Sequence, residues 1–362
     1  MIRLFLFLFS GLLLGFEAYA QQQAEAKLVW KVNRIDLGTV LEEQGLQSVT
    51  FDYTLSQGSH FAIQEVVTDC GCTTVSYSKD SLGIGESGKI SVDFDPSSAA
   101  GFFSKLVLVK GNQGQVQDSL YIEGIALPYP TNLERNYPVK LGFLGLRMKK
   151  VSMGDVFDNE PKVKYLEFFN YGTKALEKQG FHANTPAYIQ IQQVQDLVRP
   201  QERGLLKISY EAKQRSELGA VSDKVWINWS KEEEGKMELE VLADLFDYFS
   251  PISKERLEEV PQLLMSQKII QLGEISSNTV QRKSITLTNS GKENLEIIKV
   301  QGNCPCLITE YPKSLLLPGE MMELKLVFDP VGRKGIDQRN IYIFTNDPVN
   351  PVQLLVIKSR VD

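Results

Sequence analysis

The residues whose type and spacing most directly indicate chemistry are four cysteines arranged as two C-x-C pairs. They are Cys70 with Cys72, and Cys304 with Cys306. Two thiols at this spacing can form a small disulfide ring, bind a soft metal ion or exchange with other thiols. An extended i, i+2 pair places its Cα atoms roughly 6.6 Å apart, near the upper limit for a disulfide. A disulfide therefore requires a tight bend, which Gly71 permits and which Pro305 restricts.

Three uses of these pairs remain open from the residues alone. A structural disulfide suits an oxidising, exported compartment, although so small a ring would stabilise the fold far less than usual. A soft-metal site is the second use, since two thiolates suit Cu(I) or, with more ligands, zinc. Neither His60 nor His182 lies at zinc-ligand spacing, so each site would have only two protein ligands. Reduced thiols packed as small apolar groups are the third. Redox catalysis by these cysteines is less favoured, because no Lys, Arg or His flanks either pair to stabilise a thiolate, and the negative charge of Asp69 would destabilise one.

Other catalytic patterns are missing from the sequence. It contains no GxSxG, HExxH or P-loop motif, and no GxGxxG before a helix. We therefore expect no enzyme activity and no cofactor, with Cu(I) as the alternative. The chain has 39 basic and 45 acidic residues, a net charge of −6, so it lacks the basic surface of a nucleic-acid binder. We interpret Asp95-Pro96 and Asp329-Pro330 as turns and not as a carboxylate pair.

The N-terminal segment has the pattern of a secretory signal peptide. Arg3 precedes the apolar run Leu4–Phe16, and Ala18-Tyr19-Ala20 is a small-x-small cleavage site. The run has 13 residues, whereas a bilayer span needs about 20. We expect residues 1–20 to be removed after Ala20. The mature chain would then be exported, soluble, periplasmic or associated with the cell envelope, and without a membrane span.

The elements that must position the cysteines are short strands. Apolar and polar residues alternate over residues 49–55, 90–94 and 324–328, the period of strands with one buried face. Each third of the chain opens with a hydrophobic-Gly step, at Gly38, Gly154 and Gly273. Nine residues separate Gly85 from Phe94, Gln201 from Tyr210 and Gly319 from Phe328. A strand-rich period of this length predicts tandem sandwich domains.

We therefore predict an all-β fold of three tandem immunoglobulin-like antiparallel β-sandwich domains after a cleaved signal peptide. The predicted segments are a first sandwich with a C-x-C pair at 27–128, a second without one at 136–249, a linker with helical propensity at 250–267, and a third sandwich with a C-x-C pair at 268–362.

The two cysteine-bearing thirds resemble a bacterial family of unknown function with a Cys-Gly-Cys-Thr signature (domain of unknown function fifteen-seventy-three). The matching stretches are DCGCTTVSYSKDSLGIGESGKISVDFDP, NCPCLITEYPKSLLLPGEMMELKLVFDP, LTNSGKENLEI and YIFTNDPVNPVQLLVIK. This family is similar to Hydin-type and major-sperm-protein-like immunoglobulin folds. The resemblance implies such a fold for residues 32–126 and 268–361, and by analogy an interaction or scaffold role.

The leading functional hypothesis is a non-enzymatic scaffold or protein-interaction protein of the bacterial envelope, whose partner is an envelope protein or peptide. Exposed edge strands or grooves between domains would form the contact. The alternative is a Cu(I)-handling or thiol-redox protein that acts through Cys70, Cys72, Cys304 and Cys306. A periplasmic chaperone that acts by strand addition is a further alternative.

Overall fold

The computed structural model describes residues 26–111, 116–229 and 236–362. The predicted signal peptide and its cleavage site after Ala20 lie outside the described residues. The chain divides into two compact units, Met1–Thr131 and Asn132–Asp362. Among the described residues, no helix has the length and apolar character needed to cross a membrane.

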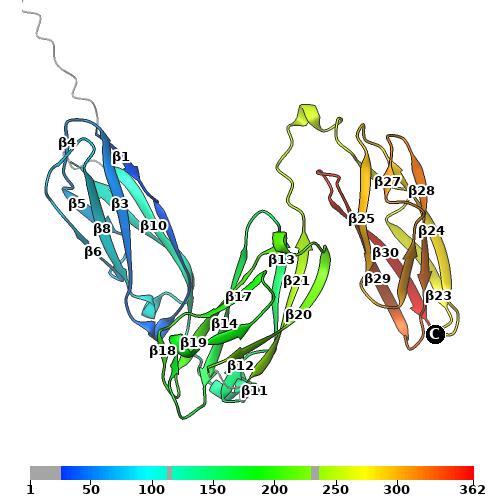
Figure 1. Cartoon of the computed structure of the whole chain (residues 1–362), viewed down its shortest axis with the longest axis horizontal. Coiled ribbons are helices and arrows are strands. Elements are labelled where there is room, and N and C mark those ends of the chain that lie inside the picture. The colour runs from blue at the N-terminus through cyan, green and yellow to red at the C-terminus, as the bar shows by residue number, and fades with distance from the viewer. Residues whose placement is uncertain (1–25, 112–115, 230–235) are drawn as a thin grey trace, which may run out of the picture. The chain divides into compact units, whose positions relative to one another are not determined.

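The first unit contains one sandwich of two four-stranded sheets (Figure 1). One sheet has the order β1 (Lys27–Trp30), β3 (Gln47–Gln57), β8 (Ser87–Phe94), β6 (Thr73–Tyr77). The other has the order β2 (Arg34–Leu41), β10 (Val116–Leu127), β9 (Gly101–Lys110), β5 (Glu65–Thr68). A small pair, β4 (His60–Phe61) and β7 (Leu82–Gly83), and two 3-10 turns, η1 (Glu42–Gln44) and η2 (Pro96–Ser98), complete it.

The second unit begins with a sandwich of the same strand order, with one additional edge strand in its first sheet. Its first sheet is β11 (Val139–Leu141), β12 (Leu144–Leu146), β14 (Lys162–Asn170), β19 (Arg203–Tyr210), β17 (Ile189–Gln193). Its second is β13 (Lys150–Phe157), β21 (Met237–Phe246), β20 (Gly219–Asn228), β16 (His182–Asn184). The remaining elements are β15 (Leu176–Glu177), β18 (Leu197–Val198), α1 (Leu133–Asn136), η3 (Lys178–Gly180) and η4 (Ala212–Gln214).

The same unit ends with a third sandwich. One sheet is β22 (Leu263–Met265), β24 (Gln281–Asn289), β28 (Met321–Phe328), β26 (Leu307–Glu310). The other is β23 (Ile269–Ile275), β30 (Val352–Val361), β29 (Gly335–Thr345), β25 (Leu295–Gly302), β27 (Leu315–Leu316). The predicted all-β fold of sandwich domains is confirmed.

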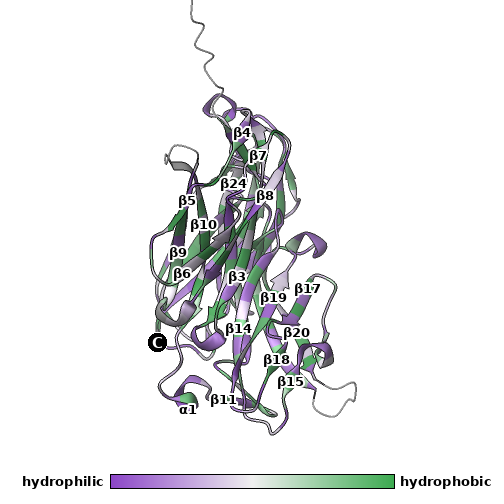
Figure 2. Ribbon diagram, turned by 90° about the vertical axis from the view of Figure 1, so that its left-hand side faces the viewer, coloured by the Kyte–Doolittle hydropathy of each residue, from purple (hydrophilic) through white to green (hydrophobic). Residues whose placement is uncertain are grey.

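Each sandwich has its own core, because alternating residues of both sheets face inward. Figure 2 shows the resulting mixture of hydrophobic and hydrophilic residues along the strands. Fully buried side chains include Phe51 and Val92 in the first sandwich, Phe168 and Val225 in the second, and Leu324 and Ile341 in the third.

The hydrophobic-Gly steps lie at bulges in a strand pair that is parallel, whereas we expected antiparallel sheets throughout. The pairs are β2–β10, β13–β21 and β23–β30, and each shifts register at its step. Gly38, Gly154 and Gly273 have φ of 68°, 72° and 72°, a left-handed conformation that glycine adopts without a Cβ penalty. The repeated glycines therefore mark one backbone feature of the sandwich.

The segment expected as a helical linker has a different structure. It contains only one 3-10 turn, η5 (Lys254–Arg256), and β22 begins at Leu263, where it pairs with β24. The third sandwich thus starts at residue 263 and not at 268. Pro261 prevents a helix from continuing through this segment.

Candidate functional site

The first cysteine turn connects β5 to the edge strand β6. Cys70 and Cys72 form a disulfide with their Cα atoms 5.3 Å apart. The Thr73 N–H donates to the Cys70 carbonyl at 3.4 Å, which closes the bend. The Asp95 N–H donates to the Cys72 carbonyl at 2.9 Å, which continues the β6–β8 ladder to the turn. The turn therefore fixes the start of the edge strand.

The third sandwich repeats this turn between β25 and β26. Cys304 and Cys306 form a disulfide with a Cα–Cα distance of 5.1 Å. The Leu307 N–H donates to the Cys304 carbonyl at 3.2 Å, and the Asp329 N–H donates to the Cys306 carbonyl at 2.9 Å. Equivalent backbone hydrogen bonds hold both turns, so the two turns share one backbone geometry.

The residue between the cysteines is less constrained than the sequence indicated. We expected the bend to depend on the freedom of Gly71, but Gly71 is not among the glycines with positive φ. A Cβ on Gly71 would meet no atom within 4 Å. Because the bend uses ordinary negative φ, Pro305 fits the same position in the third sandwich.

The Asp-Pro steps beside the turns act as the predicted turn initiators. Asp95 Oδ1 accepts the Ser97 N–H at 3.0 Å, and Asp329 Oδ1 accepts the Val331 N–H at 3.1 Å. The backbone hydrogen bond from Ser97 lowers the pKa of the Asp95 carboxyl. Each carboxylate thus stabilises a turn after the central strand.

The two disulfides have different side-chain surroundings. In the first sandwich the buried Thr73 hydroxyl lies 3.5 Å from Cys70 Sγ and 3.8 Å from Cys72 Sγ. In the third sandwich Leu307 takes the place of Thr73, and Arg333 Nη2 donates to Cys306 Sγ at 3.1 Å. Only the third disulfide therefore has a cation in contact with a sulfur among the described residues.

The middle sandwich has the same turn without cysteines. The Ile189 N–H donates to the Pro186 carbonyl at 3.0 Å, and the Glu211 N–H donates to the Tyr188 carbonyl at 2.8 Å. Pro186 and Tyr188 thus occupy the places of the two cysteines. His182 lies at the start of β16, where its side chain is exposed.

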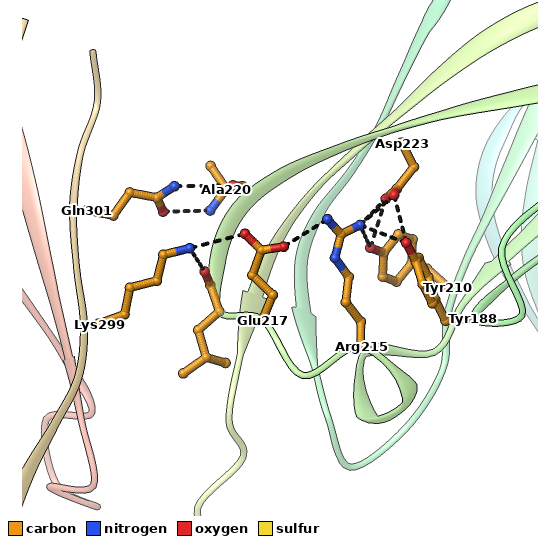
Figure 3. Close-up of polar contacts among 9 residues, drawn as sticks. Tyr188, Tyr210, Arg215, Glu217, Ala220, Asp223, Lys299 and Gln301 are labelled. Carbon is orange, nitrogen blue, oxygen red and sulfur yellow. Dashed lines mark hydrogen bonds and ion pairs between the residues drawn. The ribbon is translucent and has the colours of Figure 1, made fainter. Parts of the chain in front are cut away.

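A partly buried polar cluster surrounds Tyr188 (Figure 3). Arg215 Nη1 donates to the hydroxyl oxygens of Tyr188 and Tyr210 at 3.1 Å each, and it pairs with both oxygens of Asp223. Burial is the main cause that raises the pKa of both tyrosines, and for Tyr188 the hydrogen bond to Asp223 adds to it. Arg215 also pairs with Glu217 at 3.0 Å.

The loop after Arg215 contacts β25 of the third sandwich within the second unit (Figure 3). Lys299 Nζ donates to the Leu218 carbonyl at 2.5 Å and lies 3.4 Å from Glu217 Oε1. Gln301 accepts the Ala220 N–H at 3.0 Å and donates to its carbonyl at 3.3 Å. This contact connects the middle sandwich to the strand that leads into the Cys304–Cys306 turn.

The described residues contain no group of three or more His, Cys, Asp or Glu side chains that could hold a metal ion. All four cysteines are in disulfides. A disulfide sulfur is not a thiolate ligand, so a Cu(I) site at either pair would require that pair to be reduced.

The fold and its two cysteine turns define a tandem β-sandwich protein with disulfide-capped edge strands. The family described as "Protein of unknown function (DUF1573)" matches residues 28–126 and 263–361, and the chain belongs to this family. The predicted resemblance is thereby confirmed. The middle sandwich lies outside both matches, although it has the same strand order.

Solved structures with similarity to the chain have diverse descriptions. A protein of unknown function from Porphyromonas gingivalis W83 is similar over 60% of this chain and 100% of its own, with 16% identity and a TM-score of 0.45. The ASH / PapD-like domain 7 of human CEP192 is similar over 31% of this chain and 92% of its own, with 11% identity and a TM-score of 0.26. The secreted serine protease VesC from Vibrio cholerae is similar over 62% of this chain and 52% of its own, with 12% identity and a TM-score of 0.24. No curated protein matches the chain.

Sequence reasoning found the cysteines and missed Arg333. We expected no cation beside a thiol because none flanks either pair in sequence. Arg333 stands 27 residues after Cys306, four residues beyond Asp329. The Asp-Pro turn returns the chain to the cysteine turn and so brings Arg333 to the sulfur. An alignment of the second and third repeats could have indicated Arg333, because Arg215 stands four residues after Glu211, as Arg333 does after Asp329.

Proposed function

We propose that this protein is a non-enzymatic, exported interaction scaffold of the bacterial cell envelope, which binds a partner protein or peptide along the edge strands β6 and β26. The observation that carries the proposal is the position of each cysteine turn directly before an edge strand. Each turn fixes the first residues of a strand that pairs on one side only in the sheets of the described residues. A strand held in place before binding loses less conformational entropy when a partner pairs with it.

The open backbone positions follow from the ladder. Residues of an antiparallel pair alternately exchange hydrogen bonds and direct their backbone groups away. The Cys306 carbonyl accepts the Asp329 N–H, so Cys306 and every second residue after it face β28. Thr309 lies between two such positions, and its N–H and C=O therefore face the open edge of β26. In the first sandwich the Cys72 carbonyl accepts the Asp95 N–H, and the same alternation along the strand directs the N–H and C=O of Val75 to the open edge of β6.

Side chains beside these edges suit a protein partner. Ile308, on β26, is 57% exposed. An extended segment that pairs with β26 would gain main-chain hydrogen bonds along the edge and apolar contact with Ile308. Such β-strand addition takes specificity from alternate side chains of the added strand.

Two features support an envelope location. The N-terminal segment has the charge, apolar run and cleavage site of a signal peptide. Disulfides persist in oxidising compartments such as the bacterial periplasm and are rare in the cytosol. The mass of the protein purified from its native host without reductant tests this location. Removal of residues 1–20 and the loss of about four mass units relative to the reduced chain are expected. Retention of the segment would contradict it.

Capture from the native envelope at physiological salt tests the interaction itself. The full chain should recover a partner in stoichiometric amount, and recovery of none would contradict the scaffold role. A Cu(I) titration that saturates and is lost in Cys→Ser variants would instead support metal handling. Suppression of the aggregation of unfolded clients would support a chaperone that acts by strand addition.

A further inference from the structure

The positively charged guanidinium group of Arg333 lies beside one sulfur of the Cys304–Cys306 disulfide. This guanidinium group does not have a carboxylate of its own. Its Nη2 contacts Cys306 Sγ at 3.1 Å, while its Nη1 lies 3.5 Å from Asp337 Oδ1. Its Nε is buried and has no hydrogen-bond partner among the described residues. Asp337 also pairs with Arg339, which donates to both of its carboxylate oxygens. The guanidinium groups of Arg333 and Arg339 share the one carboxylate of Asp337. A thiolate on Cys306 would supply the second negative charge that these two cations lack.

The middle sandwich shows how the same position is occupied when an anion is already present. Arg215 is four residues after Glu211, as Arg333 is after Asp329. Arg215 contacts Tyr188, the counterpart of Cys306, and it pairs with both oxygens of Asp223 and with Glu217. Arg215 therefore has Asp223 as an anionic partner and shares Glu217 with Lys299, whereas the one carboxylate near Arg333, Asp337, is shared with Arg339.

The first sandwich lacks the cation. The residue four positions after Asp95 is Ala99, and the sulfurs of Cys70 and Cys72 contact only the Thr73 hydroxyl among the polar side chains that the structure describes. The chain thus contains two disulfide turns of the same backbone geometry, which differ in the charge beside the second sulfur.

We propose that the Cys304–Cys306 disulfide undergoes thiol–disulfide exchange with an external dithiol, whereas Cys70–Cys72 is a structural bridge, and that Arg333 causes this difference by stabilising Cys306 as the leaving thiolate. This activity is separate from edge-strand binding. A cation beside a cysteine favours its thiolate, and a better leaving thiolate departs faster and is more stable once formed. The partially exposed turn, with Pro305 exposed between the two half-buried cysteines, gives a thiol access to Cys304.

The exchange proceeds in two balanced steps. A thiolate of the external dithiol attacks Cys304 Sγ, the Cys304–Cys306 bond breaks, and Cys306 leaves as a thiolate paired with Arg333. The second thiolate of the dithiol then attacks the dithiol sulfur that is bonded to Cys304 Sγ. This attack breaks the mixed disulfide and releases Cys304, which takes a proton from solvent. The dithiol is oxidised to a disulfide by two electrons, and the cysteine pair is reduced by the same two.

Redox equilibration of the full chain tests the proposal. The folded protein is equilibrated at pH 8 with graded ratios of reduced and oxidised dithiothreitol, and the reduced fraction of each pair is read by alkylation and peptide mass. The Cys70–Cys72 pair serves as the control within the same molecule. We expect the equilibrium constant for reduction to be about tenfold larger for Cys304–Cys306, a difference of about 30 mV. After incomplete exchange with glutathione, the mixed disulfide should lie on Cys304.

Two variants separate charge from packing. R333Q removes the charge and should lower the constant of Cys304–Cys306 toward that of Cys70–Cys72, whereas R333K should retain most of the difference. Loss of structure in R333Q would expose the pair and increase its reduction, so the direction of the change distinguishes the two effects. Equal constants for the two pairs in the wild type, an unchanged constant in R333Q, or glutathione on Cys306 would overturn the proposal.

Discussion

At the scale of single residues, equivalent positions of the three sandwiches show what the fold requires. Gly85 and Gly319 have φ of 82° and 77°, and Gln201 occupies the same place in the middle sandwich with φ of 63°. Gln201 is the only described residue other than glycine with positive φ. A left-handed conformation costs a residue with a Cβ about 1–2 kcal/mol. The backbone of this turn therefore determines the conformation, whichever residue is present.

Gln201→Gly should stabilise the middle sandwich by about 0.5–1 kcal/mol, because relief of the backbone strain exceeds the added chain entropy of glycine. The Gln201 side chain is exposed, so little packing is lost. Chemical unfolding of the full chain measures the change. Gly319→Gln is the mirror control, since a Cβ there meets no atom within 4 Å, and it should destabilise the third sandwich by a similar amount. A destabilised Q201G would contradict this assignment.

A buried asparagine at the end of β24 holds the neighbouring loops of the third sandwich. Asn289 is fully buried, donates to the carbonyls of Glu293 and Leu316, and accepts the Gly291 N–H. Asn289→Ala should cost about 3 kcal/mol, because it leaves these three backbone groups without a partner. Thermal unfolding measures the loss. The exposed Asn294→Ala is the control, with an expected change below about 0.5 kcal/mol. Equal effects of the two variants would contradict this role.

At the scale of elements, the loop before β20 and the strand β25 form a charged contact inside the second unit. The pKa of Glu217 is lowered first by its hydrogen bond from Arg215 and then by the charge of Lys299. A lowered pKa means that the ionised form stabilises the fold. This contribution is present above the unfolded value of about 4.3 and is lost as the pH falls through the folded pKa.

A carbon NMR titration of the Glu217 carboxyl in the full chain should therefore give a pKa below 4.3. Lys299→Gln should raise this pKa only in part, because Arg215 remains paired with Glu217. Glu320, whose pKa is lowered by its hydrogen bond with Lys313 and not by Lys299, is the internal control. A Glu217 pKa at or above the unfolded value would contradict the contact.

The elements themselves were predictable to different degrees. Alternation over residues 49–55 and 324–328 predicted β3 and β28, because one face of each strand is buried against a core. β22 was missed, since Leu263, Leu264 and Met265 follow one another without alternation and stand after a charged segment. The parallel pairs were missed for another reason, because pairing direction depends on which distant strands meet and leaves no local period.

At the scale of the whole molecule, the sequence predicted the repeat and the cysteine turns but not what surrounds the sulfurs. The spacing of Gly38, Gly154 and Gly273 was visible because each marks the same bulge. The contact between Arg333 and Cys306 was not, because it depends on two loops that meet only in the folded domain. The middle sandwich shows that the turn survives without cysteines, so the fold alone does not require the disulfides.

The proposed function makes its strongest prediction about the backbone of the edge strands. Thr309→Pro removes an N–H that faces the open edge of β26, a position where proline is compatible with the sheet. Thr309→Val changes the side chain but keeps this N–H, and it is the matched control. Val75→Pro and Val75→Thr form the same pair on β6.

Quantitative capture from the native envelope with these four variants and the wild type is the measurement that tests edge-strand binding most directly. The account predicts that at least one proline variant loses at least tenfold of the captured partner, since each lost main-chain hydrogen bond and the displaced strand weaken pairing, while both controls capture as the wild type does. Undiminished capture by both proline variants, with their unfolding transitions unchanged, would contradict binding at these edges.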